Sequence, residues 1–380
     1  MNANEPPDEV APGRQDAPEW WIYRGNGHPL HDIRLDEVLP DPPPWRKFLG
    51  GPLPANDTPP EDDGEIERRL GHERSAAEST VDAPELDMIN AALYLRRPLI
   101  VTGPPGAGKS SLAFRIARSL RLGRVVQWHI TSHTMLKDGL YKYDAIGRAE
   151  AAAARYASIR SLSGQHRPAD DTGPDGIDAA GTSAPGERLG DFVRLGPLGT
   201  AFLPSKLPRV LLIDEFDKSE FDLPNDLLGI FEEATFPIPE LERVRQHMPE
   251  VTVFTDDPDR RATIVDGRVR CRAFPIIIIT SNGERDFPPA FLRRCLQLEM
   301  RPPDADELAA RAAAHLVDMA DDQRLELVRE FVRMSERAGG LPADRLLDAM
   351  FLATSGAYDP EDRSWPRIRD ALWRHLRTTV

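Results

Sequence analysis

Apolar residues recur along the chain in two patterns, short continuous runs and helical spacing, and these patterns alternate from about residue 84 onward. Short apolar runs that end in polar or glycine residues are typical of buried strands. Strands are predicted at PLIVTG (98–103), VVQWHITS (125–132), VLLID (210–214) and FPIIIITSN (274–282). Apolar residues at helical spacing predict helices over 85–95, 110–122 and 223–233. Because strands alternate with helices, the predicted fold class is α/β, with a parallel sheet and helices on both faces.

The last 80 residues have a different pattern and contain no convincing strand. Amphipathic helices are predicted over 304–319, 322–338, 342–354 and 365–379. A small all-helical domain over 301–380 is therefore predicted to follow an α/β domain over 83–300. Within the α/β domain, Asp266-Gly267 lies in the middle of 262–272 and predicts a hairpin there, because this dipeptide favours the tight turn.

Two segments fit neither of these apolar patterns. Residues 148–190 are rich in alanine, glycine, aspartate, serine and proline, a composition that cannot build a core, so they are predicted to form a mobile insertion. Residues 1–82 form a Pro-rich, acidic leader that is predicted to be partly extended. Aromatic residues stand out in this leader, at Trp20, Trp21, Tyr23 and Trp45. They indicate either a docking arm with anchors for a neighbouring surface or an arm packed on its own body.

Charge is distributed unevenly along the 380 residues, whose formal net charge is −14. Residues 1–83 carry 18 acidic and 8 basic side chains, so the rest of the chain is nearly balanced. This acidic balance argues against a large surface that neutralises nucleic-acid phosphates.

The sequence also excludes several classes of protein. No apolar run approaches the roughly 18 residues of a membrane span, and the acidic start lacks the apolar stretch of a secretory signal. Cys271 and Cys295 are the only cysteines, which excludes a disulfide framework and a CxxC metal site. We therefore expect a cytoplasmic protein with reduced thiols and no membrane span.

The strongest motif is GPPGAGKS, which follows an apolar strand and opens a helix. It matches the phosphate-loop pattern GxxxxGK[ST], in which backbone N–H groups cradle phosphates. In this interpretation the Lys109 ammonium spans the β- and γ-phosphates, and the Ser110 hydroxyl ligates Mg²⁺. The predicted nucleotide-binding residues are Gly103, Pro104, Pro105, Gly106, Ala107, Gly108, Lys109, Ser110 and Ser111.

Two other predicted strands end in polar groups that suit the same chemistry. The strand at 210–214 runs into Asp214 and Glu215, at the edge of an α/β sheet where ligands bind. Asp214 would hold Mg²⁺ through its water shell, and Glu215 would polarise the attacking water as general base. Asn282, at the end of 274–282, would orient that water through its amide.

Two arginines and two histidines complete the candidates. Arg293 and Arg294 are of the residue type that stabilises charge on a transferring phosphoryl group, in cis or from a neighbouring chain. Adjacent arginines are also common on solvated helix faces. His129 and His133 lack a third metal ligand nearby, which favours a structural role.

Taken in order, the phosphate loop, the Asp-Glu strand, the Thr-Ser-Asn strand, the arginine pair and the helical segment resemble AAA+ ATPases over most of 84–380. The long insertion, GPLGTAFLP (196–204) and LLIDEFDKSEFDLPNDLL (211–228) resemble the MoxR branch of that family. The resemblance implies a chaperone-like remodelling motor, generally a hexameric ring. Such motors act on partner proteins, often ones with von Willebrand A-type domains. The leader segment WWIYRGNGHP (20–29) resembles leaders of MoxR-type ATPases in bacterial multi-gene systems, which pair the ATPase with peptidase-like or von Willebrand-like proteins.

The resemblance also implies roles for single residues. It implies ATP and Mg²⁺ as ligands of a P-loop ATPase, with Asn282 as the sensor-1 residue and Arg294 as the finger that reaches a neighbouring subunit. Arg345 becomes the sensor-2 residue, which reaches the γ-phosphate in cis. The branch usually has Asp-Arg-Phe where this chain has Arg293-Arg294-Cys295, so the choice of finger stays open.

Two other functions remain open. The first is a nucleic-acid-dependent translocase, which the acidic charge disfavours and a group of hairpin arginines favours. These are Arg260, Arg261, Arg268, Arg270 and Arg272. The second is an ATP-gated assembly switch in a multi-component bacterial system, which the presence of Glu215 and Asn282 disfavours because both serve hydrolysis.

Overall fold

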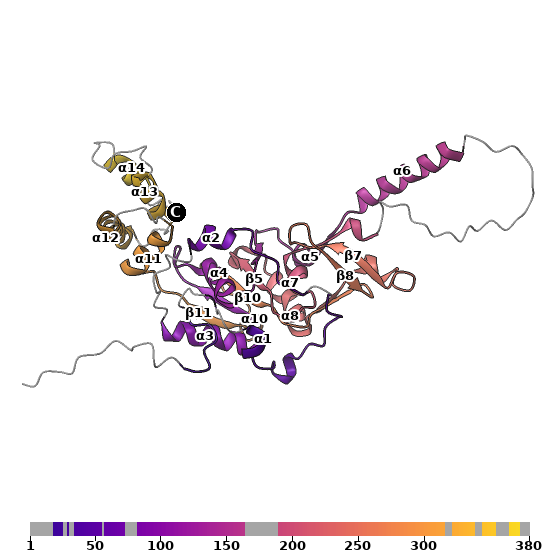
Figure 1. Ribbon diagram of the computed structural model, residues 1–380, viewed down its shortest axis with the longest axis horizontal. Helices are drawn as coiled ribbons and strands as arrows, with labels where there is room; N and C mark the ends of the chain where they lie inside the picture. The colour runs from indigo at the N-terminus through magenta and orange to yellow at the C-terminus, as the bar shows by residue number, and fades with distance from the viewer. Residues whose placement is uncertain are drawn as a thin grey trace, which may run out of the picture.

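The structure is a computed structural model, shown in Figure 1. It describes residues 18–25, 29, 34–54, 57–72, 82–163, 189–315, 321–338, 344–354 and 365–372. The chain forms two β-sheets, one among helices near the middle of the molecule and the other to its right in Figure 1.

Sheet A is a parallel sheet of five strands. In spatial order these are β11 (Leu296–Glu299), β1 (Leu99–Thr102), β10 (Ile276–Ser281), β5 (Val210–Asp214) and β2 (Val126–His129). The four predicted strands are therefore confirmed, whereas β11 was not expected. Since all strands run the same way, their carboxyl ends meet at one edge of the sheet.

Side chains on sheet A alternate between two hydrophobic cores. Along β5, Val210 and Leu212 belong to one core, whereas Leu211 and Ile213 belong to the other. The first core includes residues of α3 (Ala83–Leu95) and α4 (Lys109–Leu120). The second includes residues of α7 (Pro197–Ala201) and α8 (Leu223–Glu233). The prediction of an α/β fold with helices on both faces of a parallel sheet is thus confirmed.

Sheet B has six short strands that sequence reasoning mostly missed. In spatial order they are β3 (Tyr141–Tyr143), β4 (Val193–Leu195), β7 (Glu250–Phe254), β8 (Arg261–Val265), β9 (Arg268–Arg270) and β6 (Thr235–Pro237). The predicted hairpin is confirmed as β8–β9. Its turn residues Asp266 and Gly267 have φ of 53° and 68°, the left-handed values that the tight turn requires.

Shorter helices connect these elements. They are α1 (Leu35–Val38), α2 (Glu65–Leu70), α5 (Leu136–Leu140), α9 (Pro239–Glu242) and α10 (Pro289–Leu292), with 3₁₀ turns at Pro44–Arg46, Leu189–Phe192 and Phe216–Lys218. The segment predicted as a mobile insertion begins with a helix instead, α6 (Ala145–Ser163), which points away from the sheets in Figure 1. Residues 164–188 lie outside the described residues, so their mobility stays a prediction, whereas Leu189 and Gly190 at the end of the segment are buried in a 3₁₀ turn.

Four helices follow sheet A, as predicted: α11 (Ala305–His315), α12 (Asp321–Ala338), α13 (Asp344–Thr354) and α14 (Trp365–Leu372). They share a small hydrophobic core, to which α12 contributes Val328 and Phe331 and α13 contributes Leu346 and Met350. The described part of 301–380 contains no strand. That these helices form a separate domain remains a prediction.

The described start of the leader packs on its own body. The N–H groups of Ile22 and Tyr23 donate to Asn90 Oδ1 at 2.8 and 2.9 Å, and Asn90 Nδ2 donates to the Tyr23 carbonyl at 2.8 Å. Trp21 Nε1 donates to Asp87 Oδ1 at 2.9 Å. These contacts seat residues 18–25 on α3. Trp45, in contrast, is 74% exposed.

None of the described helices is both long enough and apolar enough to cross a bilayer.

Candidate functional site

The phosphate-loop motif forms the turn between β1 and α4, at the carboxyl edge of sheet A. Gly106 and Gly108 have φ of 82° and 94°, which glycine adopts without strain. Gly108 is the N-cap of α4 and provides no side-chain hydrogen bond. The first N–H groups of a helix point along its axis and carry partial positive charge. This loop therefore has the chemistry of an anion cradle.

Lys109, the first residue of α4, is folded back on this loop. Its ammonium donates to the carbonyls of Gly103 at 2.8 Å and Pro104 at 3.1 Å. The side chain is buried, and burial lowers the pKa of Lys109, while the charges of Asp217 and Asp214 act in the opposite direction. The structure thus places a partly desolvated cation beside the loop and near two carboxylates.

Asp214 brings three elements together at the end of β5. Its Oδ1 accepts hydrogen bonds from Ser110 Oγ at 2.7 Å and Thr280 Oγ1 at 2.6 Å. Its Oδ2 lies 3.8 Å from His129 Nδ1 on β2. Sequence reasoning assigned Ser110 and Asp214 to one site, missed Thr280, and gave His129 a structural role away from that site. Their position at the ends of strands that flank β5 was the signal that could have found them.

Glu215 follows Asp214 in a left-handed backbone conformation, with φ of 59°. Its N–H donates to Thr280 Oγ1 at 3.0 Å, which ties it to the same cluster. Its carboxylate is occupied by Lys218, whose Nζ lies 2.7 Å from Glu215 Oε2. That hydrogen bond raises the pKa of Lys218. The Glu215 side chain is 47% exposed and the Lys218 side chain is 42% exposed.

Asp217 positions the loop that carries Asn282. Its Oδ2 accepts the backbone N–H of Asn282 at 2.8 Å and that of Glu284 at 3.2 Å. The side chain is only 5% exposed, and its Oδ1 is buried without a hydrogen-bond partner among the described residues. Sequence reasoning missed this residue, although a third carboxylate in DEFD was visible. The exposed Asn282 side chain follows directly after β10, beside the cluster on β5.

The donor groups fit a nucleotide with its magnesium ion. A hydroxyl and a carboxylate 2.7 Å apart, Ser110 and Asp214, are the hard oxygen ligands that Mg²⁺ prefers. Asp217 adds a buried oxygen that lacks a partner close to Lys109. Among the described residues there is no group of three or more His, Cys, Asp and Glu side chains suited to a metal. A metal here would need oxygens from a phosphate ligand as well.

The arginine pair lies apart from this cluster. Arg294 Nε donates to Glu232 Oε1 at 2.6 Å, and its Nη1 donates to the Ala290 carbonyl at 3.1 Å. The Arg293 carbonyl accepts from Arg97 Nη1 at 3.4 Å. Both arginines line a cavity of about 370 Å³ together with Trp45, Arg46, Arg97 and Glu232. The structure therefore groups them with other cations rather than with the phosphate loop.

Two arginines of the C-terminal helices have different surroundings. Arg345 on α13 donates from Nη1 to the Leu372 carbonyl of α14 at 3.0 Å. Arg311 on α11 donates to two phosphate-loop carbonyls, those of Gly106 and Ala107. Sequence reasoning selected Arg345 and missed Arg311. Nothing in the sequence motif around Arg311 distinguishes it from other helical arginines.

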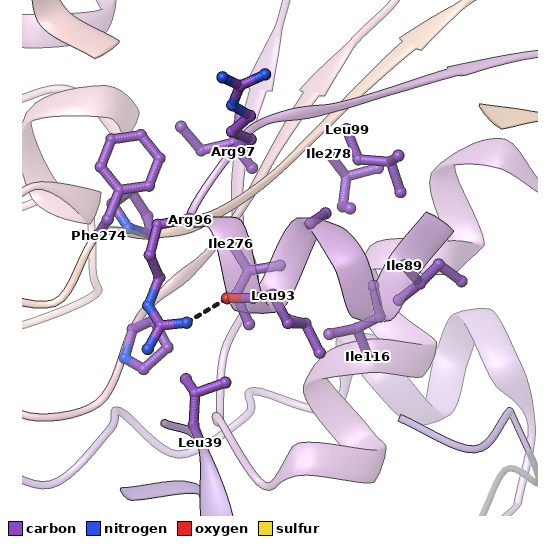
Figure 2. A pocket seen from close by; sticks show the side chains of 14 residues that line it. Leu39, Ile89, Leu93, Arg96, Arg97, Leu99, Ile116, Phe274, Ile276 and Ile278 are labelled. Atoms are coloured by element: carbon purple, nitrogen blue, oxygen red, sulfur yellow. Dashed lines mark hydrogen bonds between the residues drawn. The ribbon is translucent and has the colours of Figure 1, made fainter. Parts of the chain in front are cut away.

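A second hollow lies at the opposite edge of sheet A, where β1 and β10 begin (Figure 2). It is about 10 Å³ in volume, room for about one water molecule. Its labelled lining is mostly apolar: Leu39, Ile89, Leu93, Leu99, Ile116, Phe274, Ile276 and Ile278, with Arg96 and Arg97. The Arg96 guanidinium donates to the Leu93 carbonyl, as the dashed line shows (Figure 2). This hollow has no set of converging polar groups.

Comparison with known proteins adds little. No family model matches the sequence. No curated protein matches it either. Among solved structures, the chain is similar to C. elegans PCH-2, with a TM-score of 0.35 and 14% sequence identity over 81% of this chain and 69% of that chain. A likeness this distant supports no functional argument, so any function must be argued from the site itself.

Proposed function

We propose that this protein is an ATP-hydrolysing AAA+ remodelling motor of the MoxR type, which acts on a partner protein as a ring oligomer. The observation that carries the proposal is the cluster of Ser110, Asp214 and Thr280 at the carboxyl edge of a parallel sheet, directly beside a glycine-rich loop. A hydroxyl, a carboxylate and a loop of backbone N–H groups at one edge are the parts that phosphoryl transfer needs.

The proposed reaction is hydrolysis of the terminal phosphate of ATP. Loop N–H groups and Lys109 bind the phosphates, for which Lys109 exchanges its two loop carbonyls for phosphate oxygens. Mg²⁺, when bound through Ser110 and Asp214, supplies charge neutralisation. Glu215 takes a proton from water as its oxygen bonds to the γ-phosphorus, and the bond from that phosphorus to the bridging oxygen breaks to release ADP. Asn282 orients the water.

Two cations must move or release a partner in this scheme. Lys218 holds the carboxylate of Glu215 at 2.7 Å, so that ion pair has to open before Glu215 accepts a proton. Arg294 is engaged with Glu232, away from the phosphate loop of its own chain. We therefore assign Arg294, or its neighbour Arg293, to the active site of the next subunit of the ring.

The C-terminal helices α11–α14 serve as the lid of the motor in this proposal. ATP lies between the sheet and this lid, and hydrolysis shifts one against the other so that attached loops pull on a client protein. The client is a partner protein of von Willebrand A type or peptidase-like type, and the motor works in the cytoplasm. These finer assignments rest on the resemblance to the MoxR branch.

Nucleic-acid translocation, the second candidate, loses support from the hairpin arginines. Three of the five arginines that favoured it are held by carboxylates of the same chain. The pairs are Arg261 with Asp191 at 2.7 Å, Arg268 with Glu242 at 2.8 Å and Arg270 with Asp266 at 3.8 Å. A guanidinium already paired with a carboxylate releases fewer counterions when it meets a phosphate backbone. These pairs weaken the case for a nucleic-acid partner at the hairpin.

The test is the variant Glu215→Gln, with Glu326→Gln as its control because Glu326 is exposed on α12. Glu215→Gln should bind ATP with the parental affinity and lose at least about a hundredfold in phosphate release, since removal of a general base typically costs 10²–10⁴ in rate. The control should match the parent in both assays. Hydrolysis by Glu215→Gln at the parental rate would show that the general base lies elsewhere. Slow parental turnover with nucleotide-dependent assembly would favour the assembly switch.

A further inference from the structure

Arg311 makes a contact with the phosphate loop that the proposed mechanism does not use. Its Nη1 donates to the Gly106 carbonyl and its Nη2 to the Ala107 carbonyl, each at 3.4 Å. A Cβ atom on Gly108 would lie 3.0 Å from Arg311 Nη2. The guanidinium thus bridges two successive peptide units of the loop, and the absence of a side chain at Gly108 lets it come so close.

Among the described residues, no carboxylate forms an ion pair with Arg311. Burial lowers the pKa of Arg311, and Arg115 acts in the same direction, whereas Glu307 and Glu85 oppose them. Glu307, however, pairs with Arg301 at 3.0 Å and Glu85 pairs with Arg115 at 3.4 Å. The positive charge of Arg311 is therefore left to act on the loop, in surroundings where a cation is poorly hydrated.

The bridged carbonyls belong to the peptide units that carry the N–H groups of Ala107 and Gly108. A guanidinium on the carbonyl side holds the planes of those peptides and polarises them, which strengthens the N–H groups as donors. The Ala107 N–H donates to the Pro104 carbonyl at 3.3 Å within the loop, so the Gly108 N–H is the one of the two that the proposed function assigns to phosphate. Arg311 therefore acts on the nucleotide site from the outer side of the loop, without touching the ligand.

A second contact fixes the same helix. The Ala314 carbonyl accepts the His72 N–H at 2.9 Å, and a Cβ atom on Gly71 would lie 2.4 Å from the Ala314 oxygen. Arg118 on α4 donates to the Gly71 carbonyl at 2.7 Å. Arg311 and Ala314 are three residues apart and so lie on one face of α11. The leader residues after α2 thus join α11 to the helix that begins at the phosphate loop.

We propose that Arg311 is the positioning residue through which the C-terminal helices set the phosphate loop, so that nucleotide affinity depends on where α11 lies. This inference rests on the proposed function. It links the helical segment to the nucleotide site through α11. The resemblance implied a link through Arg345 to the γ-phosphate, but the Arg345 guanidinium is bonded to the Leu372 carbonyl within the helical segment.

The experiment measures the affinity for ADP by calorimetric titration of Mg²⁺-ADP into the full chain and its variants. Arg311→Gln should weaken ADP binding by about tenfold, within the usual range for coupled sites. Arg311→Lys should fall between Arg311→Gln and the parent, because an ammonium keeps the charge but lacks the planar, rigid fork with which the guanidinium holds two successive peptide units. The control Arg329→Gln, at an exposed position on α12, should bind ADP within about twofold of the parent.

Steady-state kinetics and thermal unfolding separate positioning from a purely structural role. Arg311→Gln should raise KM for ATP more than it lowers kcat, with the unfolding temperature of the ligand-free chain close to the parental value. If Arg311→Gln fails to fold, Arg311→Lys still gives the comparison. Parental ADP affinity in both Arg311 variants, or a loss in Arg345→Gln alone, would overturn the inference and leave the proposed function intact. A parent that binds neither ADP nor ATP would overturn both.

Discussion

The two edges of sheet A are built from the same strands and differ in almost every other respect. At the carboxyl edge, Lys109, Ser110, Asp214 and Thr280 converge within hydrogen-bond distance of one another or of the phosphate loop. At the amino edge, the hollow of Figure 2 is lined by aliphatic side chains and Phe274, and its Arg96 is bonded to the backbone of α3.

The difference shows that the hollow at the amino edge lacks the polar groups that gather at the carboxyl edge. The amino edge is where side chains leave a gap between α3, α4 and the starts of β1 and β10. At the carboxyl edge, the parallel strands end in polar residues beside a helix N-terminus, and α/β sheets bind ligands at that edge. We therefore expect substitutions at the amino edge to change stability and substitutions at the carboxyl edge to change nucleotide chemistry.

The largest expected effect at the amino edge comes from Ile278→Ala. Ile278 is 1% exposed and is paired with Leu99 in the sheet register. Truncating it should lower the free energy of unfolding by about 2–5 kcal/mol, through lost burial and an enlarged cavity. Denaturant titration measures this change. Ile146→Ala, on α6 where the side chain is 74% exposed, should change it by less than about 0.5 kcal/mol.

The expected difference between the two edges would be contradicted if Ile278→Ala changed nucleotide affinity as strongly as stability. At a temperature where the variant is fully folded, its Kd for ADP should stay within about twofold of the parental Kd, because Ile278 belongs to an apolar core and lines the hollow at the amino edge.

The smallest expected effect is at the carboxyl edge, in Lys218→Met. Removing Lys218 frees Glu215 from its ion pair, so the turnover rate should rise. Since both side chains are nearly half-exposed, the pair is worth about 0.2–1 kcal/mol, and the rise should stay below about fivefold. Phosphate release at saturating ATP measures it. A fall in turnover would mean that Lys218 assists the reaction instead of restraining Glu215.

The carboxyl edge was largely predictable from sequence because its chemistry is local. GPPGAGKS and VLLIDE are continuous segments, and the parallel strands that carry Asp214 and Thr280 bring their ends together automatically. Asp217 was missed because its function appears only when its carboxylate meets the Asn282 backbone from another strand. Arg311 was missed because its contact spans about two hundred residues of sequence.

Sheet B and the leader were less predictable, for the same reason. Strands of three residues such as β6 carry too few positions for an alternating pattern, and β6 pairs with β9 from a distant part of the chain. The position of Tyr23 depends on one buried amide, Asn90, which looks like any polar residue in a helix. The hydrogen bonds of Asn90 show that residues 18–25 pack on their own body. The exposed Trp45 leaves both alternatives, packing on the body and docking on a neighbour, open for the later leader.

The central claim is that the loop at 103–110 grips the β-phosphate of a nucleotide, and calorimetric titration of the full chain tests it most directly. With Mg²⁺ present, the parent should bind ATP and ADP at least about tenfold more tightly than AMP, since AMP lacks the phosphate that the loop and Lys109 hold. Lys109→Ala should lose about 10- to 100-fold in ATP affinity, as expected for charged hydrogen bonds of about 1.5–3 kcal/mol. Lys142→Ala, at an exposed position on β3, should bind ATP like the parent. Equal affinity of the parent for AMP and ATP, or parental ATP affinity in Lys109→Ala, would contradict the account.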